Sequence, residues 1–155
     1  MGLRWLSAAA VVAAAAPPAG AQQVRELGFQ AVGTLSDPAL AVGGLYAGWR
    51  PTRRARLTAM AGLGGSGDET AWRAELLGHF LLAPSRREGP GVYLAGGVAA
   101  VGGASDRGYV VIAMGIEDRP GAARGWFAVA GGGGGPRLSA GYRWRWFPRW
   151  WSLAQ

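Results

Sequence analysis

The residues of this chain best suited to acid–base chemistry are Glu75 and its single histidine, His79. Four positions apart in an extended segment, they share a face, and a carboxylate can orient a histidine that acts as a general base. At ~3.3 Å per residue, however, the two positions lie roughly 13 Å apart. A hydrolase also needs a nucleophile beside its histidine, and His79 is followed by Phe80 and Leu81. We therefore predict a structural histidine and no enzymatic activity.

Metal, cofactor and nucleic-acid chemistry find little support in the sequence. One histidine and no cysteine leave scattered carboxylates as metal ligands. Neither the glycines of 62–65 nor the pentaglycine 131–135 precedes a lysine, as a phosphate-binding loop would. The net charge of +7 would suit nucleic acid, but the arginines are dispersed and form no basic block. We expect no metal, no cofactor and no nucleic-acid partner.

The first 21 residues predict export. Arg4 supplies a positive charge, residues 6–16 form an apolar run followed by two prolines, and small residues at 19–21 form a cleavage site. The apolar run is roughly half of the ~20 residues that a membrane-spanning helix needs. We expect a cleaved signal peptide over 1–21 and a single domain over 22–155.

Composition limits how that domain can be stabilised. Cysteine is absent, which excludes a disulfide framework. The 28 glycines could indicate disorder, but 50% of the residues are hydrophobic and 16% are charged, which is the wrong balance for a disordered chain. The glycines instead suit tight turns and close contacts in a curved sheet.

Period-two alternation divides the domain into eight segments separated by turn residues. The turns are too short for the crossovers of a parallel sheet. We therefore predict an all-β fold, an eight-stranded antiparallel up-and-down transmembrane β-barrel. The predicted strands are 25–35, 39–50, 54–64, 70–82, 91–102, 108–117, 124–131 and 137–147.

Most of these strands have one apolar and one mixed or polar face. From Trp72 to Leu82 the even positions are apolar or glycine, whereas the odd positions include Arg73, Glu75 and His79. An amphipathic helix over 70–82 is the alternative, because alanine, glutamate and leucine favour helices. Segments 91–102 and 124–131 are apolar or glycine on both faces, so their orientation is not assigned.

The last strand alternates aromatic and basic side chains. Tyr142, Trp144 and Trp146 line one face, and Arg143 and Arg145 line the other. A soluble protein would bury the aromatic row, whereas a membrane barrel turns it toward lipid and the arginines toward its lumen.

The same strand resembles the C-terminal assembly signal of bacterial outer-membrane β-barrel proteins. Ser139, Gly141, Trp144 and Trp146 match its order of a polar residue, a glycine and two alternating aromatics, although this chain continues over 147–155. The resemblance implies a small barrel in the outer membrane of a Gram-negative-type bacterium. Its expected partners are outer-membrane lipids and the barrel assembly machinery.

The positions of the aromatic residues also favour a membrane barrel. If the strands alternate in direction, the large aromatics fall near strand ends, as in the aromatic girdles that flank a hydrocarbon zone. In a soluble core they would lie mid-strand. The predicted lipid-interface aromatics are Trp49, Trp72, Tyr93, Trp126, Tyr142, Trp144 and Trp146, with Tyr109 expected at the same end as Trp72.

The polar rows then fill a narrow lumen, where enclosed charges must be paired. Closure sets the first strand beside the last, so we predict that Glu26 lies near Arg143 or Arg145. A second cluster would join Glu75 to Arg73 with help from a neighbouring strand. The predicted lumen network is Glu26, Gln30, Tyr46, Arg56, Arg73, Glu75, His79, Arg143 and Arg145.

We expect a structural, surface-interaction or small-solute role. The rival hypothesis is a soluble periplasmic or secreted lipocalin-like barrel that holds an apolar ligand. It requires the opposite arrangement, with apolar rows pointing inward and charged rows pointing outward.

Overall fold

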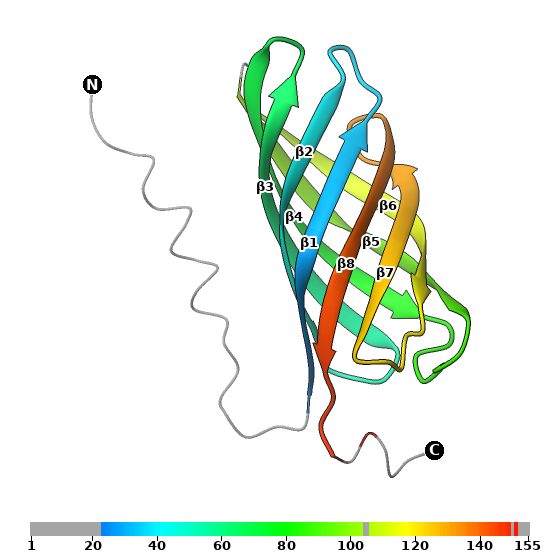
Figure 1. Ribbon diagram of the computed structural model, residues 1–155. Coiled ribbons are helices and arrows are strands. Elements are labelled where there is room, and N and C mark those ends of the chain that lie inside the picture. The colour runs from blue at the N-terminus through cyan, green and yellow to red at the C-terminus, as the bar shows by residue number, and fades with distance from the viewer. Residues whose placement is uncertain (1–22, 104–105, 150, 152–155) are drawn as a thin grey trace.

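Eight antiparallel strands follow one another in chain order and close into a barrel (Figure 1). The computed structural model describes residues 23–103, 106–149 and 151, so the predicted signal peptide over 1–21 lies outside the described residues. The strands are β1 (Val24–Thr34), β2 (Leu40–Arg50), β3 (Ala55–Ser66), β4 (Glu69–Leu81), β5 (Pro90–Gly102), β6 (Arg107–Asp118), β7 (Arg124–Gly132) and β8 (Pro136–Trp146).

The predicted fold class is confirmed, and the strand boundaries agree closely with the alternation in the sequence. The segment for which a helix was the alternative is strand β4, paired with β3 and β5 along its length. The backbone N–H and C=O groups of β4 are hydrogen-bonded to the two neighbouring strands, whereas in an amphipathic helix they would be hydrogen-bonded within the segment itself. No helix within the described residues is both long and apolar enough to cross a lipid bilayer.

Pairing between β1 and β8 closes the sheet. Glu26 lies opposite Arg145 in this pair, and ten residues of β1 have partners in β8, from Arg25 to Thr34. The start of β1 and the end of β8 therefore meet at one end of the barrel, at the bottom of Figure 1. We call this the terminus end; it also carries the β2–β3, β4–β5 and β6–β7 connections. The other four connections lie at the opposite end.

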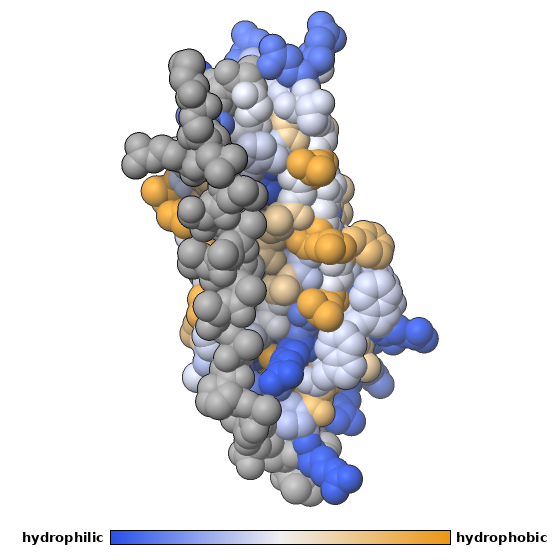
Figure 2. Space-filling model, turned by 90° about the vertical axis from the view of Figure 1, so that its left-hand side faces the viewer, coloured by the Kyte–Doolittle hydropathy of each residue, from blue (hydrophilic) through white to orange (hydrophobic). Residues whose placement is uncertain are grey.

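The barrel wall is apolar outside and polar inside. On the outer face Leu45 is 77% exposed and Ile112 is 72% exposed, whereas the inward-facing Arg56 is 1% exposed. Figure 2 shows hydrophobic side chains between hydrophilic ends on the face toward the viewer. Exposed large side chains occur on every strand and include Leu27, Leu63, Leu76, Val98, Val110, Trp126 and Leu138.

The structure assigns the two strands whose faces look alike in sequence. In β5, Tyr93, Ala95 and Ala99 face inward, and in β7, Phe127 and Val129 do so. The rings of Phe127 and Tyr93 each lie over a glycine. A Cβ at Gly141 would lie 2.6 Å from Cζ of Phe127, and one at Gly115 would lie 2.6 Å from the hydroxyl of Tyr93.

Adjacent glycines of β2 test this close packing. A Cβ at Gly44 would lie 2.6 Å from the carbonyl carbon of Ala61 on β3, whereas one at Gly43 would meet no atom within 4 Å. Gly44→Ala should lower the free energy of unfolding by about 1–3 kcal/mol, because the backbone of β3 must shift. Gly43→Ala should change it by less than about 0.5 kcal/mol.

The measurement is urea unfolding of the refolded protein, followed by tryptophan fluorescence. Equal stability of the two variants would contradict the assigned faces of β2.

Candidate functional site

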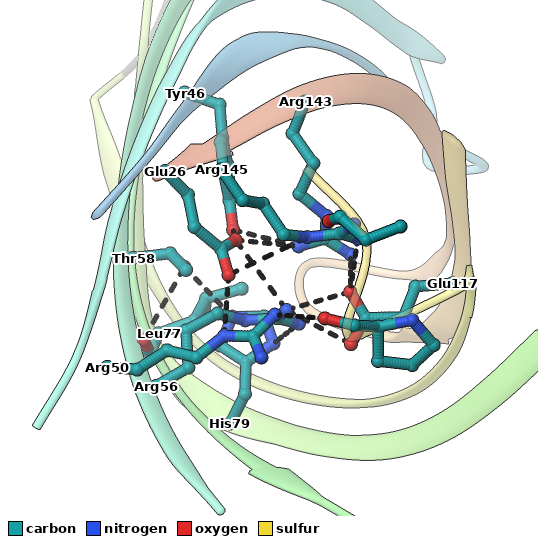
Figure 3. Close-up of polar contacts among 12 residues, drawn as sticks. Glu26, Tyr46, Arg50, Arg56, Thr58, Leu77, His79, Glu117, Arg143 and Arg145 are labelled. Carbon is teal, nitrogen blue, oxygen red and sulfur yellow. Dashed lines mark hydrogen bonds and ion pairs between the residues drawn. The ribbon is translucent and has the colours of Figure 1, made fainter. Parts of the chain in front are cut away.

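The interior of the barrel near the terminus end holds a dense ionic cluster (Figure 3). Two carboxylates and four guanidinium groups meet there from five strands, all with fully buried side chains in their ion pairs. We call this group the terminus-end cluster. Its members are Glu26 (β1), Arg50 (β2), Arg56 (β3), Glu117 (β6), Arg143 and Arg145 (β8).

Glu26 joins the strands on its side of the cluster. Its Oε1 accepts a hydrogen bond from Nε of Arg50 at 2.7 Å, and its Oε2 accepts one from the Tyr46 hydroxyl at 3.1 Å. Nη1 of Arg143 donates to Oε2 of Glu26 at 3.3 Å and to the Tyr46 hydroxyl at 2.9 Å. Nε of Arg145 lies 3.9 Å from Glu26. The predicted approach of Glu26 to Arg143 and Arg145 is confirmed.

Glu117 binds three guanidinium groups, each of which also contacts Glu26. Its Oε2 lies 3.0 Å from Nη1 of Arg56, 2.7 Å from Nη2 of Arg143 and 2.9 Å from Nη2 of Arg145. Arg145 also donates to the carbonyl of Ala122 at 2.9 Å. One carboxylate shared by three arginines is a charge-assisted network that links β3, β6 and β8 across the lumen.

Two arginines of the terminus-end cluster also lie over the faces of aromatic rings. Cζ of Arg143 lies 4.3 Å from the ring centroid of Phe127, and Cζ of Arg56 lies 4.7 Å from that of Tyr93. A guanidinium over an aromatic face within about 6 Å is stabilised by the ring quadrupole, and more so where water is excluded.

His79 takes a structural position beside the terminus-end cluster. Nη2 of Arg56 lies 3.2 Å from Nδ1, so this ring nitrogen accepts. Nε2 then carries the proton and donates to Oγ1 of Thr58 at 2.8 Å. A neutral imidazole with both nitrogens engaged satisfies a buried polar side chain. Glu75, its predicted partner in acid–base chemistry, is bound elsewhere.

A second ionic group lies toward the opposite end. Nε of Arg73 donates to Glu75 at 2.6 Å, and Arg137 donates two hydrogen bonds to the same carboxylate at 3.0 and 2.6 Å. The predicted pairing of Glu75 with Arg73 is confirmed. The prediction that a strand next to β4 would assist was wrong. The assisting residue, Arg137, comes from β8, which is not a neighbour of β4 in the sheet. A narrow lumen lets side chains meet across it.

Side chains fill the space between the two ionic groups. An internal cavity of about 10 Å³ remains beside Gln30, Tyr46, Tyr93 and Phe127, which is room for one water molecule at most. At the opposite end, a hollow of about 390 Å³ reaches down to Arg73. The described part of the lumen is therefore a packed plug with an open cup at one mouth.

Residues after β8 cover the terminus-end mouth. Trp151 is 4% exposed, and its ring and that of Phe147 lie 6.0 and 5.9 Å from Cζ of Arg50. The two rings also contact each other, with centroids 5.2 Å apart. The chain beyond the predicted assembly motif thus begins as an aromatic cover over the terminus-end cluster.

The structure places every predicted lumen residue inside the barrel. Sequence reasoning missed three further members, Arg50, Glu117 and Arg137. Two of them could have been found from the alternation of side chains along a strand. Arg50 lies on the same face of β2 as Tyr46, and Arg137 lies on the same face of β8 as Arg143 and Arg145. Those placed as predicted are Glu26, Gln30, Tyr46, Arg56, Arg73, Glu75, His79, Arg143 and Arg145.

Among the predicted interface aromatics, Tyr93 was placed wrongly. It is 1% exposed and points inward, because Gly115 lies opposite it in register on β6 and leaves room for its ring. Tyr109 likewise lines the hollow at the opposite end and does not join an outer row. The other predicted aromatics point outward: Trp49, Trp72, Trp126, Tyr142, Trp144 and Trp146.

The four residues of the predicted assembly motif divide between the two faces. Ser139 and Gly141 face the interior, and Trp144 and Trp146 are 43% and 54% exposed outside. Gly141 has a packing role, since it makes space for Phe127. Whether the motif also acts in assembly stays a prediction.

These geometries define a class of protein: a closed eight-stranded barrel with an ionic, packed interior and an apolar exterior. Within the described residues, no group of histidine and acidic side chains is arranged to hold a metal ion. A lipocalin-like barrel requires the reverse orientation of its faces, which is not observed.

Comparison with known proteins agrees with this class in fold. Neither the protein-family models nor the curated proteins contain a match to this chain. A solved structure that is similar is the N-terminal β-barrel domain of OprF from Pseudomonas aeruginosa, with a TM-score of 0.64 and 15% sequence identity over 83% of this chain and 100% of that one. The similarity confirms the predicted fold, an eight-stranded antiparallel β-barrel like that of an outer-membrane barrel domain.

Substitution of two adjacent acidic residues, Glu117 and Asp118, tests how much the terminus-end cluster contributes to stability. Glu117→Gln leaves Arg56, Arg143 and Arg145 without their shared carboxylate, so it should lower the free energy of unfolding by about 3–5 kcal/mol. Asp118 pairs with Arg119 at the surface, 3.0 Å away with the arginine side chain 49% exposed. Asp118→Asn should therefore cost less than about 1 kcal/mol.

Urea titration of both variants under the conditions used for the wild type gives the comparison. A Glu117→Gln protein as stable as Asp118→Asn would show that the buried pairs contribute little.

Proposed function

We propose that this chain is an integral outer-membrane β-barrel protein of a Gram-negative-type bacterium, with a structural role in the envelope and no catalytic centre. The observation that carries the proposal is the inversion of polarity: ionised side chains lie inside a closed barrel and large apolar side chains cover its outside. A soluble barrel would expose that apolar wall to water at a large free-energy cost.

The dimensions of the wall support insertion in a bilayer. The strands are 9 to 13 residues long, and a membrane-spanning strand needs about 9–11. Closure leaves no strand edge whose backbone groups would be unpaired in lipid. Outward aromatics lie near the strand ends at the terminus end, among them Trp126, Trp144 and Trp146, as in the girdles of membrane barrels.

Export and assembly complete the proposal. The signal peptide expected over 1–21 would deliver the chain across the inner membrane. The motif of Ser139, Gly141, Trp144 and Trp146 would then be recognised by the barrel assembly machinery, and outer-membrane lipids would surround the finished wall.

A structural role is favoured over the other roles expected of a small barrel. The packed lumen, with an internal cavity of about 10 Å³, argues against a solute channel. His79 and Glu75 are held in separate ionic groups inside that lumen, which argues against acid–base catalysis. The strands at the end opposite the termini are joined by short connections, which offer little surface for adhesion.

Cell fractionation tests the location. The protein should pellet with outer membranes, resist extraction by alkaline wash, and migrate faster on gels when left unheated, since a closed barrel stays compact in detergent. A periplasmic marker protein serves as the control for leakage. Recovery of the chain in osmotic-shock fluid, with one mobility at all temperatures, would exclude the membrane location.

Conductance across planar bilayers tests the closed lumen. The wild-type protein should show no stable open channel. A Tyr93→Ala/Phe127→Ala variant, which removes two interior rings, should conduct more than the wild type. Sustained conductance of the wild type in the same bilayers would contradict a purely structural role.

A further inference from the structure

Exposed charge is distributed unequally between the two ends of the barrel. All three connections at the terminus end contain arginine, and further arginines stand on the strands and after β8. Among the described residues, the acidic ones outside the lumen at this end are Glu88 and Asp118, and Asp118 pairs with Arg119. The arginines outside the lumen at this end are Arg25, Arg53, Arg54, Arg86, Arg87, Arg119, Arg124 and Arg149.

The opposite end has the reverse composition. In the described residues its exposed charges are Asp37, Asp68, Glu69 and Asp106, with Arg107 as the basic one. A charge difference between two ends of an apolar cylinder means that the two headgroup regions of a bilayer would meet different surfaces.

Two of the arginines stand within the aromatic belt of the outer wall. Arg25 on β1 lies in register with Trp146 on β8 and Trp49 on β2. Arg124 on β7 lies in register with Trp144 on β8. Both arginines are exposed, and β8 lies between their strands. We call Arg25, Arg124, Trp144 and Trp146 the arginine–tryptophan patch.

The patch has the chemistry of a phosphate site at a membrane interface. Arg25 and Arg124 are two inter-strand spacings apart, about 10 Å, and are offset by two residues, about 7 Å, along β8, a separation that two long guanidinium side chains can span. Guanidinium groups bind phosphate through paired hydrogen bonds, and indole rings favour the headgroup level.

An apolar groove lies farther along the same strands, with Trp126 and Tyr142 between it and the patch. It has a volume of about 660 Å³ and lies on the outer wall, where small side chains stand between larger ones. Ala128 and Ala140 form its floor on β7 and β8, and Met114, Ile116 and Leu138 border it. Ala128 and Ala140 lie four residues from Arg124 and Trp144, roughly 13 Å along the strands, which is a depth that the middle of an acyl chain reaches.

We propose that the wall of β1, β8 and β7 binds an anionic phospholipid of the leaflet around the terminus end. Arg25 and Arg124 hold its phosphate beside Trp144 and Trp146, and one acyl chain lies in the groove. The proposal rests on the membrane location proposed above. Beyond that location, it specifies the class of lipid that is bound and the part of the barrel wall that binds it.

Quenching of tryptophan fluorescence by brominated lipids tests it, because two of the chain's eight tryptophans belong to the patch. The protein is refolded into vesicles of brominated phosphatidylglycerol or brominated phosphatidylcholine, each diluted with the unbrominated lipid of the other kind. Near the terminus end we expect the wild type to prefer phosphatidylglycerol by about fivefold, the effect of roughly one basic side chain at an anionic surface.

Variants separate a binding site from general attraction. Arg25→Gln/Arg124→Gln should abolish the preference, whereas Arg107→Gln, at the opposite end, should keep it. Ala140→Leu fills the groove and keeps both arginines, so it should reduce the preference if the acyl chain is held there.

Each other outcome has a distinct meaning. Equal quenching of the inserted wild type by both lipids would overturn the proposal. The patch would then be a surface for an acidic protein or for a second copy of the chain. An undiminished preference in Arg25→Gln/Arg124→Gln or in Ala140→Leu would overturn the assigned site. Absence of quenching by either lipid, with the protein remaining in solution, would instead refute the membrane location.

Discussion

The structure depends on the pairing of guanidinium groups that are sealed inside the barrel. Arginines outnumber carboxylates among the buried residues described, so each glutamate serves more than one of them. An unpaired buried charge is very costly, and a carboxylate shared by several arginines is the arrangement that limits this cost here. Glu26 and Glu117 pair with arginines of strands from around the barrel, and except for Glu26–Arg50, which joins the adjacent strands β1 and β2, these ion pairs need the closed sheet. Closure and charge pairing are therefore coupled.

Once the charges are inside, the outer wall follows. Alternation along a strand sends every second residue outward, and these positions are filled by leucine, valine, isoleucine and aromatic side chains. The wall is then suited to hydrocarbon, and the polar residues left outside gather at the two ends. Their signs differ, with arginine at the terminus end and mainly acidic residues at the other. This difference gives the cylinder a direction, and the lipid site that we propose uses it.

Aromatic side chains have two separate roles in this barrel. Those outside, such as Trp144 and Trp146, stand at the level proposed for lipid headgroups. Those inside, Tyr93 and Phe127, stack on arginines and close the lumen, and each depends on a glycine opposite it for space. The same residue type thus supports both the interface and the plug, and the direction of the side chain decides which.

The sequence by itself determined the strands, their order and most of their faces. Period-two alternation and turn residues are local properties, so they appear in the chain before it folds, and in a membrane barrel a charged residue on one face marks that face as the interior. Closure of an even-stranded barrel also predicted the approach of Glu26 to Arg143 and Arg145.

The tertiary structure alone decided the orientation of β5 and β7, the inward turn of Tyr93, and the meeting of Arg137 with Glu75. In β5 and β7 both faces consist mostly of apolar residues and glycine, so the alternation does not show which face points inward. The space for Tyr93 comes from Gly115 on the next strand, and Arg137 reaches Glu75 across the lumen. Contacts between opposite walls depend on the diameter and register of the closed barrel, which no local pattern contains.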